Sequence, residues 1–132
     1  MTPPPPAFGA NSNAARDIAT VLHPYTDLVT HQEVGPQVIT KGKGVRVWDD
    51  SGKDYIESVA GLWCASLGFD NERLVQAATN QMRKLPFYHA FNAKSHEPMI
   101  ELAEMLLARA PVPMSKAFFA NSGSEANDSV IK

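Results

Sequence analysis

This sequence of 132 residues has few cysteines, no long apolar run and no cluster of basic residues. It holds one cysteine, Cys64, which excludes an intramolecular disulfide. No run approaches the roughly 18 apolar residues of a membrane helix, and the N-terminus lacks a secretory signal. The net charge is −2 and basic residues do not cluster, as they would in a protein that binds nucleic acid. We therefore expect a cytoplasmic protein without nucleic-acid or membrane partners.

The four histidines are not arranged in the sequence as metal ligands usually are. They are His23, His31, His89 and His96. The sequence therefore predicts no metal site.

The N-terminal part of the chain is typical of a tail followed by a small α+β segment. Residues 1–13 contain four consecutive prolines and no charge, which predicts a flexible, extended tail. A short helix is expected over 14–22, before Pro24. Three β-rich runs follow, at residues 38–40, 44–48 and 54–57. Gly42 separates the first two and an Asp-Asp-Ser-Gly turn the second two. Residues 14–60 are thus predicted to be a small-domain segment with a β-meander.

The C-terminal half has the pattern of an α/β domain. Apolar residues recur at helical spacing over 71–85 and 95–110. The short apolar run 117–120 predicts a buried strand, and another helix begins after it. Because a lone strand has no partners for its backbone groups, the rest of this sheet is expected beyond Lys132. Residues 61–132 are therefore predicted to be the beginning of a larger domain.

The turn Ser122-Gly123-Ser124-Glu125 lies between this predicted strand and the last helix. The first N–H groups of a helix have no internal partner and carry partial positive charge, so a phosphate fits there. Gly123 has no Cβ to keep an anion away. The same Ser-x-x-Glu pattern is also a capping box, which needs no ligand. From these residues alone, capping and phosphate binding both stand.

A family resemblance connects this turn with stretches upstream. Residues 121–127, Asn-Ser-Gly-Ser-Glu-Ala-Asn, resemble the phosphate-binding turn of class III pyridoxal-phosphate (PLP) aminotransferases, the omega-transaminase group. Five other stretches agree with that family in order and spacing: His23-Pro24-Tyr25-Thr26, residues 44–49, residues 60–64, Gly68-Phe69 and residues 85–88. The similarity extends from about Ala14 to Lys132. It implies the N-terminal part of a fold-type I PLP-dependent transferase that forms a homodimer at full length.

The resemblance also implies roles for individual residues. Gly123 and Ser124, with Ser122, would hold the PLP phosphate. Three aromatic residues would line the substrate pocket: Trp63, Tyr25 and Phe91. Without the family, Trp63 would be interpreted as ordinary core, because buried aromatics are common.

The resemblance assigns no catalytic residue to this chain. The Schiff-base lysine and the acidic partner of the cofactor ring are expected beyond Lys132, which itself lies on the helix after the turn. Cys64 has no activating partner nearby in the sequence and is predicted to be a small buried hydrophobe. His89 is predicted to be a packing or interface residue.

The function implied is the transfer of an amino group from a primary amine or ω-amino acid to a keto acid such as pyruvate, through PLP. The runner-up within the family is the biotin-pathway transaminase. A rival from another class is a truncated, non-catalytic product that pairs with a full-length subunit. A third alternative is an aminomutase or decarboxylase on the same scaffold, because fold does not fix function.

Overall fold

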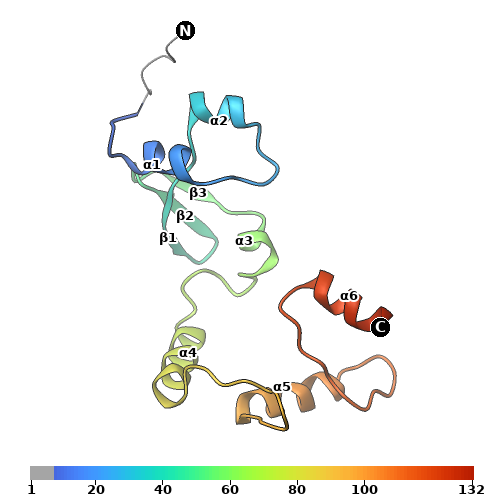
Figure 1. Ribbon diagram of the computed structural model, residues 1–132. Coiled ribbons are helices and arrows are strands. Elements are labelled where there is room, and N and C mark those ends of the chain that lie inside the picture. Colours follow the sequence, from blue (N-terminus) through green and yellow to red (C-terminus); the bar gives the residue numbers. More distant parts are fainter. Residues whose placement is uncertain (1–7) are drawn as a thin grey trace. The chain divides into compact units, whose positions relative to one another are not determined.

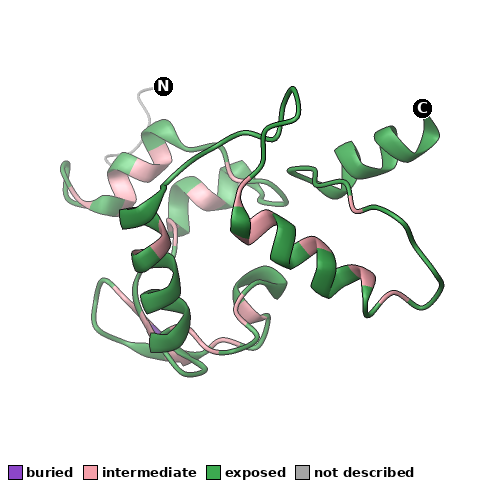
Figure 2. Cartoon of the chain, turned by 90° about the horizontal axis from the view of Figure 1, so that it is seen from below, coloured by how far each residue is buried: buried purple, intermediate pink, exposed green. Residues whose placement is uncertain are grey.

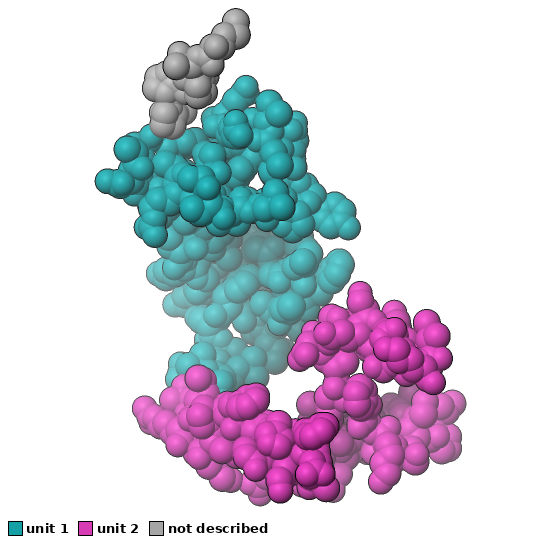
Figure 3. Space-filling model, in the orientation of Figure 1, with its two compact units in different colours: residues 1–78 teal, residues 79–132 magenta. Residues whose placement is uncertain are grey.

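The computed structural model describes residues 8–132 (Figure 1). The chain consists of two compact units, Met1–Ala78 and Thr79–Lys132 (Figure 3). Residues 1–7 of the predicted tail lie outside the described residues. Within residues 8–132, no helix is both long and apolar enough to cross a membrane.

The first helix agrees with its prediction to within two residues at its C-terminal end. Helix α1 spans Asn13–Thr20, where residues 14–22 were expected. It begins at Ser12, whose hydroxyl oxygen accepts the N–H of Ala15 at 3.1 Å. This cap satisfies one of the N–H groups that a helix leaves without an internal partner.

A second short helix, α2 (Leu28–Val34), was not predicted. Asp27 caps it by accepting the N–H of Val29 at 3.0 Å, and Gly35 ends it with a φ of 75°. An Asp before an apolar residue and a glycine after the last turn are the two signals that would have revealed this helix.

The predicted β-meander is confirmed as a three-stranded antiparallel sheet in the order β1-β2-β3. The strands are β1 (Ile39–Lys43), β2 (Arg46–Asp49) and β3 (Asp54–Ile56). The first turn was misplaced, because Gly42 lies inside β1 and pairs with Val47. Val47 is 6% exposed and is the one buried hydrophobic residue in the described part of the chain (Figure 2).

Gly42 is required by a close approach. A Cβ at this position would lie 2.5 Å from the Cβ of Phe69. The N–H of Phe69 also donates to the carbonyl oxygen of Gly44 at 3.1 Å, and the N–H of Gly44 donates to Asp70 Oδ1 at 2.8 Å. The segment after α3 (Ala60–Trp63) is thereby attached to the β1-β2 hairpin.

Asp49 organises the turn between β2 and β3. Its Oδ1 accepts from the hydroxyl of Ser51 at 2.6 Å and from the backbone N–H groups of Ser51 and Lys53. Its Oδ2 accepts from the Tyr55 hydroxyl at 2.7 Å. These hydrogen bonds, that of the Ser51 hydroxyl first, lower the pKa of the Asp49 carboxyl from 3.8 to about 2.

A pH dependence of stability follows from Asp49. Because its pKa is lower in the folded chain, its contribution to stability is present above pH 4 and lost as the pH falls from about 4 to about 2. Asp49→Asn is expected to flatten the pH dependence of the free energy of unfolding in that window. Asp50→Asn, at the neighbouring exposed carboxylate, is the matched control. Denaturant titrations at several pH values measure this, and equal pH slopes for wild type and Asp49→Asn would contradict it.

The two long predicted helices are confirmed with slightly shorter bounds. They are α4 (Glu72–Lys84) and α5 (Glu97–Leu107). The Nζ of Lys84 and Oε2 of Glu97 form a salt bridge of 2.8 Å between their facing ends. Both side chains are about two-thirds exposed, so solvent screens this pair and it adds little stability.

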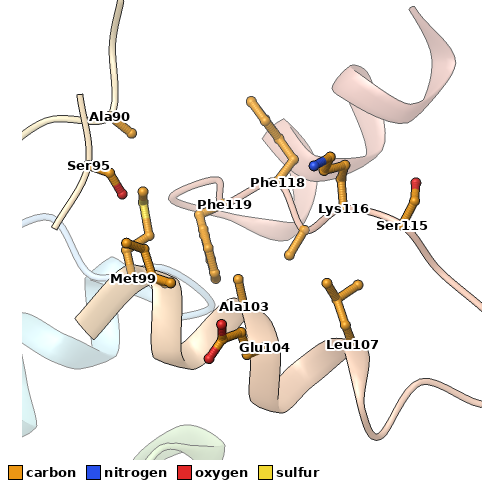
Figure 4. Close-up of a pocket in the computed structure, with 12 residues that line it drawn as sticks. Ala90, Ser95, Met99, Ala103, Glu104, Leu107, Ser115, Lys116, Phe118 and Phe119 are labelled. Carbon is orange, nitrogen blue, oxygen red and sulfur yellow. The ribbon is translucent and has the colours of Figure 1, made fainter. Parts of the chain in front are cut away.

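The predicted strand at Ala117–Ala120 is wrong: no strand is formed there in the described chain. The segment is extended, and Figure 4 shows Phe119 directed toward α5 and Phe118 directed away from it. This alternation is that of a strand, but no neighbouring strand pairs with the backbone of these residues within 8–132. Phe119 instead lines a pocket with Met99, Ala103 and Leu107 of α5.

Candidate functional site

The turn at Ser122 begins helix α6 (Gly123–Ile131) and forms a capping box. The hydroxyl oxygen of Ser122 accepts the N–H of Glu125 at 3.2 Å. The carboxylate of Glu125 accepts the N–H of Asn121 at 2.9 Å, one residue before the cap, whereas the sequence predicted a bond to the N–H of Ser122 itself. The capping interpretation of the sequence is therefore confirmed, and it fixes how the chain enters α6.

The same capping leaves room for an anion. Ser122 satisfies the N–H of Glu125, while the N–H groups of Gly123 and Ser124 have no acceptor within the described residues. A Cβ built on Gly123 would meet no atom within 4 Å, so the surface beside the helix start is open. Two N–H groups without an acceptor and two serine hydroxyls can donate to a phosphate, and the positive end of the helix dipole favours its negative charge. The residues present thus fit the phosphate of PLP.

Lys132 lies at the other end of α6. Its ammonium forms an ion pair of 2.6 Å with Asp128, one turn earlier on the same exposed helix.

Trp63 closes α3, a single turn with unusual backbone geometry. Four successive residues, Ala60 to Trp63, have positive φ values between 50° and 71°. Left-handed backbone costs about 1–2 kcal/mol for each residue other than glycine. Trp63 is 84% exposed, and most large hydrophobic residues of the described chain are also exposed, to differing degrees.

Glu57 holds this strained turn, a role that the sequence analysis missed. Its Oε1 accepts the N–H of Val59 at 3.0 Å and its Oε2 accepts the N–H of Gly61 at 2.6 Å. Hydrogen bonds to a carboxylate are about twice as strong as neutral ones. Strained backbone held by specific contacts is often found at functional sites, and here the carboxylate of Glu57 holds the backbone of the turn that ends at Trp63.

The other two predicted pocket aromatics are also exposed. Tyr25 has a φ of 52° and a fully exposed ring, and Phe91 is 81% exposed. Asn92 and Ala93, directly after Phe91, have positive φ values too. Tyr25 and Trp63 belong to the unit Met1–Ala78, and Phe91 and the start of α6 to the unit Thr79–Lys132.

Two further residues, Cys64 and His89, had predicted environments. Cys64 was expected to be buried, but it is exposed in the described chain, where it directly follows the left-handed turn. His89 is stacked on the ring of Tyr88, with ring centroids 4.8 Å apart and planes inclined by 17°. His89 is exposed in the described chain, and its packing or interface role stays a prediction.

Comparisons with known proteins identify the family. The family model Aminotransferase class-III matches residues 29–132. Putrescine–pyruvate aminotransferase of Pseudomonas aeruginosa is 48% identical over 111 residues, which cover 84% of this chain and 24% of that protein. Mitochondrial gamma-aminobutyrate transaminase 1 of Oryza sativa subsp. japonica is 48% identical over 113 residues, 85% of this chain and 22% of that protein.

Solved structures agree with these relatives. The omega transaminase of Pseudomonas jessenii in complex with PMP has 60% identity and a TM-score of 0.87, over 91% of this chain and 26% of that one. The PMP-bound aminotransferase of Vibrio fluvialis has 34% identity and a TM-score of 0.87, over 94% of this chain and 27% of that one. The chain thus spans about a quarter of the length of its relatives. The chain belongs to the class-III aminotransferases, and its mixed helix and antiparallel-sheet fold is the N-terminal part of the fold of these PLP-dependent enzymes.

Proposed function

We propose that the protein carrying this sequence transfers an amino group from a primary amine or ω-amino acid to a keto acid such as pyruvate, with PLP as its cofactor. The observation that carries the proposal is the open N-terminus of α6, whose Gly123 and Ser124 N–H groups suit the cofactor phosphate. Membership of the class-III aminotransferases supports it independently. The homodimeric state and the cytoplasmic location are part of the same proposal.

When bound, PLP supplies the carbonyl group and the electron sink of the reaction. In the proposed site the first N–H groups of α6 and the hydroxyl of Ser124 bind its phosphate and fix its position. The Ser122 hydroxyl has a lesser part, because its oxygen already accepts the N–H of Glu125. The lysine that holds the cofactor would come from sequence outside these 132 residues.

Three aromatic side chains would shape the amine pocket: Trp63, Tyr25 and Phe91. Flat rings offer large apolar area with few rotatable bonds, which suits amines with apolar bodies. The name of the Pseudomonas aeruginosa relative, which pairs putrescine with pyruvate, favours an amine:pyruvate activity over the biotin-pathway alternative.

The test is an assay of the full-length protein saturated with PLP. Putrescine, γ-aminobutyrate and an arylalkyl amine are each incubated with pyruvate, and alanine is measured by chromatography. We expect alanine to form in proportion to the amine consumed, and only when both substrates are present. Isomerisation of an amino acid without pyruvate would identify an aminomutase, and release of CO2 a decarboxylase. Either result, or a folded protein that produces no alanine from any amine, would contradict the proposal.

A further inference from the structure

The fold brings two histidines and an aspartate together at a place that the proposed transaminase site does not use. Asp17 lies on α1, His23 in the loop that follows, and His31 on α2. The Nε2 atoms of His23 and His31 lie 2.8 Å and 3.1 Å from the same oxygen, Oδ1 of Asp17. The two imidazole rings are 4.7 Å apart between centroids and inclined by 53°. The spacing of the histidines in the sequence did not indicate this cluster, because it depends on the unpredicted helix α2.

The cluster has the dimensions of a metal site. Its three ligand atoms all lie within 4.8 Å of one another. In a tetrahedral zinc site, metal–ligand bonds of about 2.1 Å place the ligand atoms about 3.4 Å apart. The two nitrogen–oxygen separations, 2.8 Å and 3.1 Å, need only small adjustments to reach that value. Imidazole nitrogens with one carboxylate are the ligand set of Zn²⁺ and related divalent ions.

The surroundings of the cluster suit a bound ion. The side chain of His31 is 9% exposed and that of Asp17 21%, so two ligands are held in place by their neighbours. The side chain of His23 is 32% exposed, which leaves a path for the ion and room for water ligands. The carboxylate offsets part of the charge of a divalent ion.

From this geometry we propose that Asp17, His23 and His31 form a binding site for a divalent transition-metal ion of the zinc type, with water at the remaining position. In the ion-free chain each Nε2 carries a proton and donates it to Asp17. On binding, that proton moves through solvent to Nδ1, and the freed Nε2 lone pair coordinates the ion. The ion would then cross-link α1, the loop and α2, and restrain the turn that holds Tyr25, two residues after His23.

The experiment uses the full-length protein that carries this sequence, in a Cys64→Ser background so that the exposed thiol does not bind the ion. Zn²⁺ is titrated by calorimetry, and Co²⁺ by its visible absorption. We expect one site whose dissociation constant weakens by about tenfold or more in His23→Ala and in His31→Ala. Asp17→Asn, which keeps the side-chain size but loses the charge, should weaken it as well.

His89→Ala and His96→Ala are the matched controls, because neither histidine belongs to the cluster. They should leave the site unchanged, and circular dichroism confirms that each variant is folded. One contrary result is that Asp17→Asn, His23→Ala and His31→Ala bind Zn²⁺ as tightly as the controls do. The other is that neither the wild type nor any variant binds Zn²⁺. In both cases the three side chains form only a hydrogen-bonded contact. Either result overturns the proposal. None of these readouts depends on transaminase activity.

Discussion

Replacing Gly123 by valine is expected to weaken PLP binding by about 30- to 150-fold in the full-length enzyme. A branched side chain at the first position of α6 would push the phosphate away from the N–H groups of Gly123 and Ser124. Hydrogen bonds to a charged group contribute about 2–3 kcal/mol, and 1.4 kcal/mol is a tenfold change in affinity. Equilibrium titration of the apoenzyme with PLP, followed by its absorbance, measures the change.

The structure separates this loss from misfolding. A Cβ at Gly123 would meet no atom of the described chain, and glycine is the weaker helix former, so Gly123→Val should not destabilise α6. Ser129→Val places the same side chain at an exposed position of the same helix and serves as the control. Unchanged PLP affinity in Gly123→Val would mean that the turn at Ser122 is only a helix cap.

The turn at Ser122 shows how far sequence reasoning can go. The order Ser-x-x-Glu predicted the helix start, and the capping box is present in the structure. This was possible because a cap depends on residues only a few positions apart. The sequence left open whether this turn only caps the helix or also binds a phosphate. Local geometry does not decide this question, because it concerns a ligand.

The predictions that failed involve contacts between distant residues. The run Ala117–Ala120 has no partner strand within residues 8–132, and pairing cannot be read from one segment. Gly42 appeared to be a turn residue, whereas its real constraint is the close approach of the Phe69 side chain, whose Cβ is the nearest atom.

Glu57 is the clearest example of a structural contact that the sequence concealed. In the sequence it only ends a β-rich run, and its role appears once both carboxylate oxygens are seen to accept N–H groups of the turn that carries Trp63. Three residues of this turn other than glycine have positive φ: Ala60, Leu62 and Trp63. Their left-handed conformation costs about 3–6 kcal/mol in total, which the contacts of Glu57 help to offset.

Trp63→Leu is therefore expected to shift the preference of the enzyme toward bulky amines. Loss of the indole enlarges the pocket, and a change of pocket size alters the ratio of kcat/KM values by about tenfold or more. The measurement is kcat/KM with pyruvate for one arylalkyl amine and one small aliphatic amine. An unaltered ratio between the two amines would remove Trp63 from the pocket.

Glu57→Ala should shift the same ratio in the same direction, because the indole is no longer held in place. Glu57→Gln keeps one carbonyl oxygen as an acceptor and should restore part of the wild-type ratio. Glu33→Ala, at an exposed glutamate of α2, is the matched control. If Glu57 acts through Trp63, adding Glu57→Ala to Trp63→Leu should change the ratio no further. If the ratio of kcat/KM values in the double variant shifts by the sum of the two single effects, the two residues act independently. The turn then does not position the indole.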